Sequence, residues 1–105
     1  MDSHATAVKI IMTWNIKPES EQDYFEFVIR ELIPGIQRSG AELSDAWATV
    51  YGSGPQITVG ALLPSLNRAR QFLSSPEWNT LYDRLLGFVQ DYSMKIIEAR
   101  GGFQL

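Results

Sequence analysis

The feature that most constrains the fold is the order in which strand-like and helix-like apolar patterns alternate along the chain. A strand pattern over Val8 to Ile16 is followed by a helical pattern, two more strand patterns, a second helical pattern and a last strand pattern. With 105 residues there is room for one domain and no second core. This order therefore predicts an α+β sandwich, in which helices pack against a single sheet.

The first and third strand patterns are the most apolar. Alternate residues of the first strand are large and apolar, which predicts a face covered by helices: Val8, Ile10, Met12, Trp14 and Ile16. Ile57 to Leu63 repeats this alternation. The second strand pattern, Ala41 to Tyr51, is more polar, as expected of an edge strand, and Leu43, Trp47 and Tyr51 share a parity. We therefore predict a four-stranded, antiparallel-type sheet of order 4-1-3-2, and we expect the two central strands, the first and third, to be parallel.

Apolar stripes and capping residues mark two helical regions. The first runs from Ser20 to Ser39, where Ser20 and Asp23 offer a capping pair and Gly40 follows as a left-handed terminator. Pro34 predicts a kink, or a stop and restart, because it lacks an N–H group and crowds a preceding carbonyl. The expected buried stripe is Phe25, Val28, Ile29, Leu32 and Ile36.

The second helical region begins after Pro64, with Ser65 as its cap, and restarts at Ser75, where a hydroxyl, a proline and an acid follow one another. We expect its second helix to run from Pro76 to about Asp91, and the last strand from Ser93 to Arg100. The stripe of this helix is Trp78, Leu81, Tyr82, Leu85, Val89 and Tyr92.

Composition excludes several classes of protein. A net charge of −3 provides no basic field for nucleic acid, and no apolar run approaches the ~20 residues that span a membrane. The absence of cysteine excludes disulfides and thiolate ligands. Residues 1–7 lack the features of a secretory signal, so we expect a flexible N-terminal tail, a domain over 8–100, a C-terminal tail over 101–105 and a cytoplasmic location.

The predicted topology places both helices on one side of the sheet and leaves the other face uncovered. Ile11 and Leu62 would then be exposed in a monomer, so we predict that they form a homodimer interface in which two sheets pair face to face. The space between two partly polar sheets can hold a small molecule. The candidate ligand-binding residues are Lys9, Thr13, Asn15, Trp47, Tyr51 and Thr58.

The complete element order, together with the broken second helix FLSSPEWNTLYDRLLGFV, resembles the ferredoxin-like, dimeric α/β-barrel superfamily. That superfamily includes antibiotic-biosynthesis-type monooxygenases, haem-degrading enzymes, EthD-like proteins and NIPSNAP-like domains. The segments VYGSGPQITVG and SSPEWNTLY are most similar to the NIPSNAP-like branch. The resemblance implies a homodimer with a small hydrophobic or aromatic ligand between its two sheets.

Each candidate residue also has a simpler structural interpretation. Asn15 is similar to a strand-borne asparagine of the cofactor-free oxygenase branch, but asparagine is also common where a strand ends. Trp14 and Trp78 are expected in the core, whereas Trp47 and Tyr51 line the cavity only if their parity faces it. Lys9 could anchor an anion or act as a base, although a lysine there more often reaches past the sheet edge or pairs with a carboxylate.

Histidine and metal chemistry have little support in this sequence. His4, in the leading tail, is the only histidine, so haem binding through a helix histidine is not expected. A tyrosine ligand, Tyr82 or Tyr92, has no specific support. The carboxylates form no recognised metal-ligand set, and Gly52-Ser53-Gly54 is a turn rather than a phosphate-binding loop. We therefore expect neither a metal nor another cofactor.

Three functions stay open on the sequence. The leading interpretation is a homodimer that binds a small hydrophobic or aromatic molecule without a cofactor. The first alternative is a cofactor-free monooxygenase or isomerase of the antibiotic-biosynthesis type, and the second is a purely structural or interaction module. The residues do not decide whether the protein is an enzyme.

Overall fold

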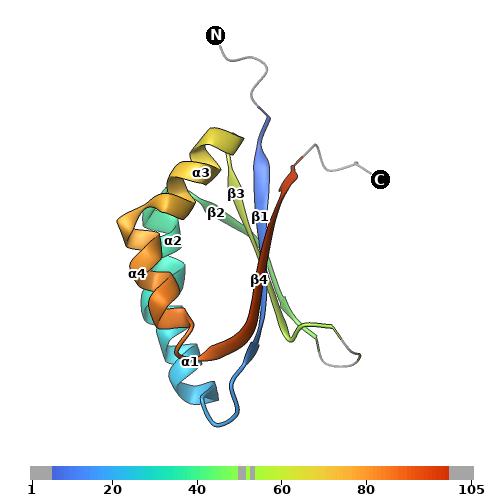
Figure 1. Cartoon of the computed structure of the whole chain (residues 1–105), viewed down its shortest axis with the longest axis vertical. Coiled ribbons are helices and arrows are strands. Elements are labelled where there is room, and N and C mark those ends of the chain that lie inside the picture. The colour runs from blue at the N-terminus through green and yellow to red at the C-terminus, as the bar shows by residue number, and fades with distance from the viewer. Residues whose placement is uncertain (1–5, 50–51, 53, 100–105) are drawn as a thin grey trace.

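A computed structural model describes residues 6–49, 52 and 54–99 of the chain. Its four strands form one sheet, and every labelled helix lies on the same side of that sheet (Figure 1). The predicted α+β, ferredoxin-like order is confirmed. The elements are β1 (Val8–Ile16), α1 (Glu21–Phe27), η1 (Val28–Leu32), α2 (Ile33–Arg38), β2 (Glu42–Ala48), β3 (Ile57–Leu63), α3 (Leu66–Ser74), α4 (Pro76–Leu85) and β4 (Val89–Glu98).

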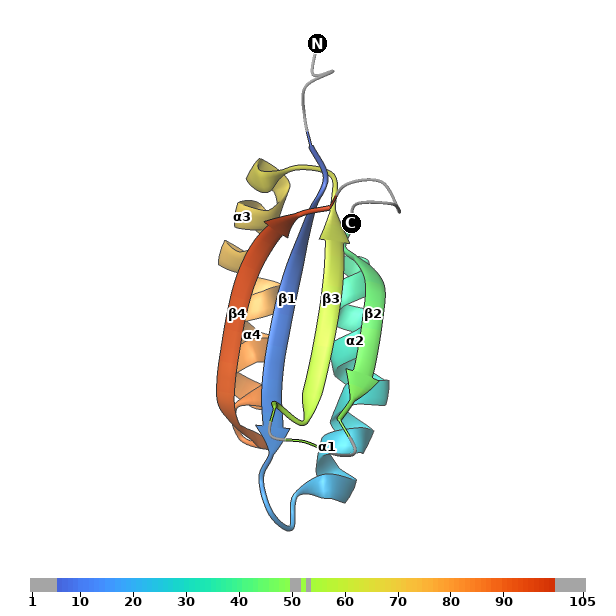
Figure 2. The same cartoon turned by 90° about the vertical axis from the view of Figure 1, so that its right-hand side faces the viewer.

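The strand order is β2-β3-β1-β4, which is the predicted order read from the other edge (Figure 2). The expectation that the two central strands are parallel is wrong, since β1 and β3 pair antiparallel with Ile10 opposite Ala61. The connections explain the difference. The helical crossover returns β2 in the direction of β1, and the hairpin then reverses β3, which inserts between them.

The core lies between the sheet and the helices. Even-numbered residues of β1 are buried, as the alternation predicted, and Trp14 and Trp78 are both core residues. Packed around them are residues from every helix and from β3 and β4, among them Tyr24, Phe27, Leu32, Ile36, Ala61, Leu63, Phe72, Leu81, Leu85 and Val89. The expected burial of Phe25 and Ile29 is wrong, because 50% and 68% of their surfaces are exposed.

A π-helical turn explains this change of face. The segment η1 inserts one wide turn immediately before Pro34, the position at which the sequence predicted an interruption. The buried residues on the two sides of that turn, Phe27 and Leu32, are therefore five residues apart instead of three or four. A stripe drawn at regular helical spacing consequently follows the wrong face through Phe25 and Ile29.

The helix ends also differ in part from expectation. Ser65 and Ser75 accept hydrogen bonds from backbone N–H groups of their helices, as predicted, whereas the Ser20 side chain makes no capping bond. The expected extension of α4 to Asp91 is wrong. The helix ends at Leu85 in a turn that contains Gly87, so Val89 and Tyr92 belong to β4, which starts earlier than Ser93.

A β-bulge on the edge strand changes which residues of β2 share a face. Leu43 lies opposite Ala61 on the helix side, but the pairing shifts between Leu43 and Asp45. Beyond the bulge, Trp47 lies opposite Thr58 on the open side of the sheet. Leu43 and Trp47 therefore do not share a face as the sequence predicted, and Tyr51 lies outside the described residues.

Candidate functional site

The open face of the sheet carries five of the six residues that the sequence proposed for ligand binding. Lys9, Thr13 and Asn15 point to this face from β1, because the intervening residues are buried against the helices. Thr58 lies opposite Thr13, and Trp47 lies opposite Thr58, so these three form a row across the sheet. Tyr51, the sixth residue, is not among the described residues.

Lys9 already has a partner within its own chain. Its Nζ lies 2.6 Å from Oδ2 of Asp45 on β2, and both side chains are partly exposed. The hydrogen bond from Lys9 and its positive charge hold the pKa of the Asp45 carboxyl below its usual value. The Lys9 and Asp45 side chains meet above Gly60, which lies opposite Asp45. Because Gly60 has no side chain, nothing separates the two charged groups.

Both polar atoms of the Asn15 side-chain amide are also hydrogen-bonded. Its Oδ1 accepts a 2.7 Å hydrogen bond from the backbone N–H of Gln56, and its Nδ2 donates a 3.0 Å bond to Oδ2 of Asp91. Asp91 has a positive φ of 60° and lies where the pairing of β1 with β4 shifts. Asn15 thus joins the end of β1 to the β2–β3 hairpin and to the irregular start of β4.

Large apolar side chains share the open face with these polar groups. Ile11 and Leu62, the two residues predicted at a dimer interface, are half-buried there and lie on the two central strands of the sheet. Ile97, opposite Lys9, is 42% exposed, and Trp47 is 53% exposed. Figure 1 shows that none of the described helices covers this side of the sheet. The face is therefore amphipathic.

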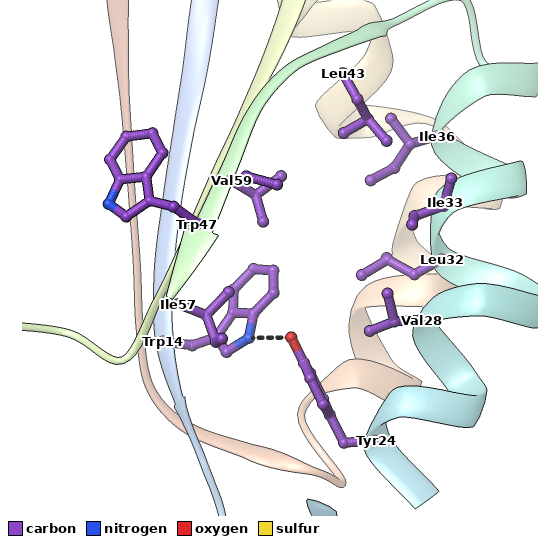
Figure 3. A pocket seen from close by; sticks show the side chains of 11 residues that line it. Trp14, Tyr24, Val28, Leu32, Ile33, Ile36, Leu43, Trp47, Ile57 and Val59 are labelled. Carbon is purple, nitrogen blue, oxygen red and sulfur yellow. Dashed lines mark hydrogen bonds between the residues drawn. The ribbon is translucent and has the colours of Figure 1, made fainter. Parts of the chain in front are cut away.

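A pocket of about 220 Å³ lies on the opposite side of the sheet, between the edge strand β2 and the first helical region (Figure 3). Three strands form one wall, and α1, η1 and α2 form the other. The lining residues are almost all apolar: Trp14, Tyr24, Val28, Leu32, Ile33, Ile36, Leu43, Ala46, Trp47, Ile57 and Val59. Trp47 contributes from the strand, but its ring lies on the far side of the sheet, as Figure 3 shows.

Two of the residues that line this pocket are joined by a hydrogen bond between their side chains. Nε1 of Trp14 donates a 2.9 Å bond to the hydroxyl oxygen of Tyr24, and both residues are buried. Burial raises the pKa of the Tyr24 hydroxyl, although the bond from Trp14 partly opposes that effect. Tyr92 stacks on Trp14 at a ring distance of 6.1 Å, and burial and the neighbouring Tyr82 raise the pKa of Tyr92 as well. The hydroxyls of Tyr24 and Tyr92 are therefore neutral at pH 7.

The sequence did not predict this pocket. Of the proposed ligand residues that the structure describes, only Trp47 contributes to its lining. Two signals were present but insufficient: Pro34, which marks the irregular helical region over the pocket, and the small Ala46 on the edge strand. The pocket depends on the π turn and on the bulge, because these two irregularities set which side chains of η1 and β2 face each other.

Within residues 6–49, 52 and 54–99, no cluster of three or more histidine, cysteine, aspartate or glutamate side chains could hold a metal ion. None of the described helices combines the length and the apolar character needed to cross a membrane. The candidate site is therefore an apolar pocket with one polar pair, lying behind an amphipathic sheet face.

Comparison with known proteins identifies the fold. The sequence matches no protein-family model and no curated protein. A NIPSNAP family protein from Agrobacterium tumefaciens str. C58 superposes with a TM-score of 0.71 at 18% identity, over 94% of this chain and 90% of that one. The chain shares its ferredoxin-like α+β fold. An uncharacterized NIPSNAP domain protein from Burkholderia xenovorans gives a TM-score of 0.67 at 12% identity, over 92% and 96% of the two chains.

The same ferredoxin-like fold occurs in an antibiotic-biosynthesis-monooxygenase-like protein from Nitrosomonas europaea. It superposes with a TM-score of 0.71 at 10% identity, over 93% of this chain and 94% of that one. These similarities agree with the NIPSNAP-like and monooxygenase-like resemblance predicted from the sequence. Identities this low establish the ferredoxin-like fold alone, so the function has to be argued from the residues of this chain.

Proposed function

We propose that the protein binds a small, neutral, largely apolar molecule, such as a one- or two-ring aromatic compound, in the pocket between β2 and the first helical region. The observation that carries this proposal is a pocket of about 220 Å³ lined almost entirely by apolar side chains. For comparison, an apolar cavity of about 150 Å³ binds benzene. Apolar pockets with a few placed polar groups are the usual form of small-molecule sites.

We also propose that two copies pair through their open sheet faces. Ile11, Leu62 and Ile97 together present apolar surface that is left uncovered by the helices of the described part of the chain. A second copy is a suitable partner because, in a two-fold dimer, the apolar residues of one face would pack on those of the other. The positive Lys9 and the negative Asp45 lie beside these residues and could pair with their opposites across the interface. The space between the sheets, bordered by Lys9, Thr13 and Thr58, is then a second place for a ligand.

A cofactor-free monooxygenase or isomerase is the alternative function. Such a reaction would use the same apolar pocket to hold a substrate that supplies its own carbanion. The similarity to the monooxygenase-like protein from Nitrosomonas europaea supports this alternative at the level of fold. The binding proposal does not depend on it, because an apolar pocket serves a binder and an enzyme equally.

A native mass spectrum of gently purified protein tests the assembly first. We expect a dimer, with added mass where a ligand has been retained. A monomer at micromolar concentration would remove the pairing proposal and the inter-sheet site, but it would leave the pocket within each chain.

Blocking the pocket tests the binding site itself. Ala46 lines the pocket, so Ala46→Phe should fill it and abolish the binding of naphthalene, a neutral two-ring probe, in a calorimetric titration. Ala48→Phe is the matched control, because Ala48 lies on the same strand and the same face but outside the lining. Equal binding of the probe by wild type and both variants would overturn the assignment of the ligand to this pocket.

A further inference from the structure

The edge strand β2 gives the open sheet face an acidic side. Glu42 and Asp45 lie on this face, since their pairing partners on β3 are Leu62 and Gly60. Glu42 is exposed and forms no ion pair within the described part of the chain. Both side-chain hydrogen bonds that Asp45 accepts from described residues, among them the one from Lys9, end on its Oδ2. Oδ1 of Asp45 is therefore available to a second donor.

The opposite edge strand, β4, carries the complementary charge (Figure 2). Lys95 lies on the open face, because it pairs with Ile11 of β1. It is exposed, and among the described residues it has neither an ion-pair nor a hydrogen-bond partner. Asp91, at the start of β4, is already bonded to Asn15. Lys95 is thus a positive charge on the uncovered face that nothing in its own described chain neutralises.

The two edges are level with each other across the sheet. Lys95 pairs with Ile11. Ile11 also pairs with Gly60 of β3, and Gly60 pairs with Asp45, so these residues form one row across the strands. Lys95 and Asp45 lie at the two ends of this row, three strand spacings or roughly 14 Å apart. They are too far apart to pair within one chain, but a second copy turned by 180° would match them.

Two sheets that pair face to face about a two-fold axis can be oriented in two ways. If the axis runs across the strands, each edge strand faces its own copy, so the acidic β2 strands approach each other and so do the two Lys95 residues. If the axis runs along the strands, β4 faces the partner's β2 and opposite charges meet. Ile11 and Leu62 lie on the central strands and are covered in both arrangements. The charges therefore decide between the two orientations.

We propose that the two-fold axis runs along the strands and that Lys95 of each copy pairs with Asp45 of the other, with Glu42 beside it as a second acceptor. This inference rests on the proposed pairing of sheet faces. It goes beyond that pairing by fixing the orientation of the two copies and by naming the residue that sets it. A lysine opposite an aspartate suits packed sheets, which lie about 10 Å apart, because the long lysine stem crosses most of this gap. Complementary charges at an interface select its register and its partner.

A zero-length carbodiimide cross-link tests this contact in the wild-type protein. The reagent activates a carboxylate, an adjacent lysine amine attacks it, and an amide forms while the reagent leaves as its urea. We expect the covalent dimer, isolated on a denaturing gel and mapped by mass spectrometry, to contain Lys95 joined to Asp45 or Glu42. Such a link has to connect two copies, because these residues lie on opposite edges of one sheet. A covalent dimer in which Lys95 is not joined to either acid would overturn the proposed orientation.

Charge reversal measures how much the contact contributes. Lys95→Glu replaces two attractive contacts per dimer with two repulsive ones, so at low salt we expect the dimer to dissociate about tenfold more readily in sedimentation equilibrium. Adding Glu42→Lys restores an opposite pair and should recover most of this loss. Arg70→Glu is the matched control, because it makes the same change of charge at an exposed position on α3. Added salt should weaken the wild-type dimer by screening these pairs.

The outcomes separate the orientation from the pairing itself. Equal dimer affinities for Lys95→Glu and Arg70→Glu would overturn the role of Lys95 and leave the pairing of sheet faces in place. A wild-type protein that stays monomeric at micromolar concentration would overturn the pairing, and the orientation with it. The cross-link on the wild-type protein decides the orientation even if Lys95→Glu does not fold.

Discussion

The indole nitrogen of Trp14 and the hydroxyl oxygen of Tyr24 lie 2.9 Å apart and join the C-terminal part of β1 to the first turn of α1. Both residues are almost fully buried. Without this bond, the N–H of Trp14 and the hydroxyl of Tyr24 would each be a polar group in the core with no partner. The bond therefore has two consequences. It allows a large aromatic residue to pack on a central strand of the sheet, and it fixes one wall of the apolar pocket.

Removing the hydroxyl should destabilise the fold measurably. In Tyr24→Phe the Trp14 N–H loses its acceptor in a buried position, which costs about 1–3 kcal/mol. Urea unfolding followed by tryptophan fluorescence measures this loss. Tyr82→Phe is the control, since the Tyr82 hydroxyl makes no hydrogen bond within the described part of the chain, and we expect a change below about 0.5 kcal/mol. Equal losses in the two variants would show that the bond contributes nothing specific.

The elements most visible in the sequence were those whose side chains repeat regularly. In β1, every second residue is large and apolar, and the structure buries each of these residues against the helices. Ser75 and Pro76 marked the start of α4 correctly, because a hydroxyl cap and a proline act within a single turn. Local chemistry and regular periods thus sufficed for the order of the elements and of the strands.

The candidate site was less predictable because two irregularities create it. The π turn η1 rotates the helix between Phe27 and Leu32, and the bulge after Leu43 moves Trp47 to the opposite face. Each inserts or shifts a single residue, and neither leaves a composition that differs from a regular helix or strand. The choice between regular and irregular backbone depends on packing between β2 and α2, which are joined by tertiary contacts rather than by local sequence.

A charge placed on the open face should prevent pairing of the sheets. Ile11→Asp would bury an unpaired carboxylate at the proposed interface, so we expect the variant to sediment as a monomer where wild type forms a dimer. Ile29→Asp is the matched control, because Ile29 is 68% exposed on the helical side. An unchanged dimer in Ile11→Asp would move the interface away from this face.

Asn15 should contribute to stability whether or not it contacts a ligand. Its amide bridges the N–H of Gln56 and the carboxylate of Asp91, so Asn15→Ala removes two bonds that join three strand ends. We expect a loss of about 1–2 kcal/mol in urea unfolding, since each exposed bond contributes only modestly. Unchanged stability in Asn15→Ala would contradict this structural role.

The ion pair between Lys9 and Asp45 should make stability sensitive to acid. The folded protein lowers the pKa of Asp45, so the unfolded chain takes up a proton at this residue before the folded chain does. The pair therefore stabilises the fold at neutral pH. This contribution is lost as the pH falls from roughly 4 through the lowered pKa of Asp45 in the folded protein.

Asp45→Asn should have a lower melting temperature than wild type at pH 7 and show a smaller further decrease on acidification. Asp83→Asn, at an exposed position on α4, should leave the acid dependence of wild type unchanged. Parallel acid profiles for wild type and Asp45→Asn would show that the pair is too exposed to matter.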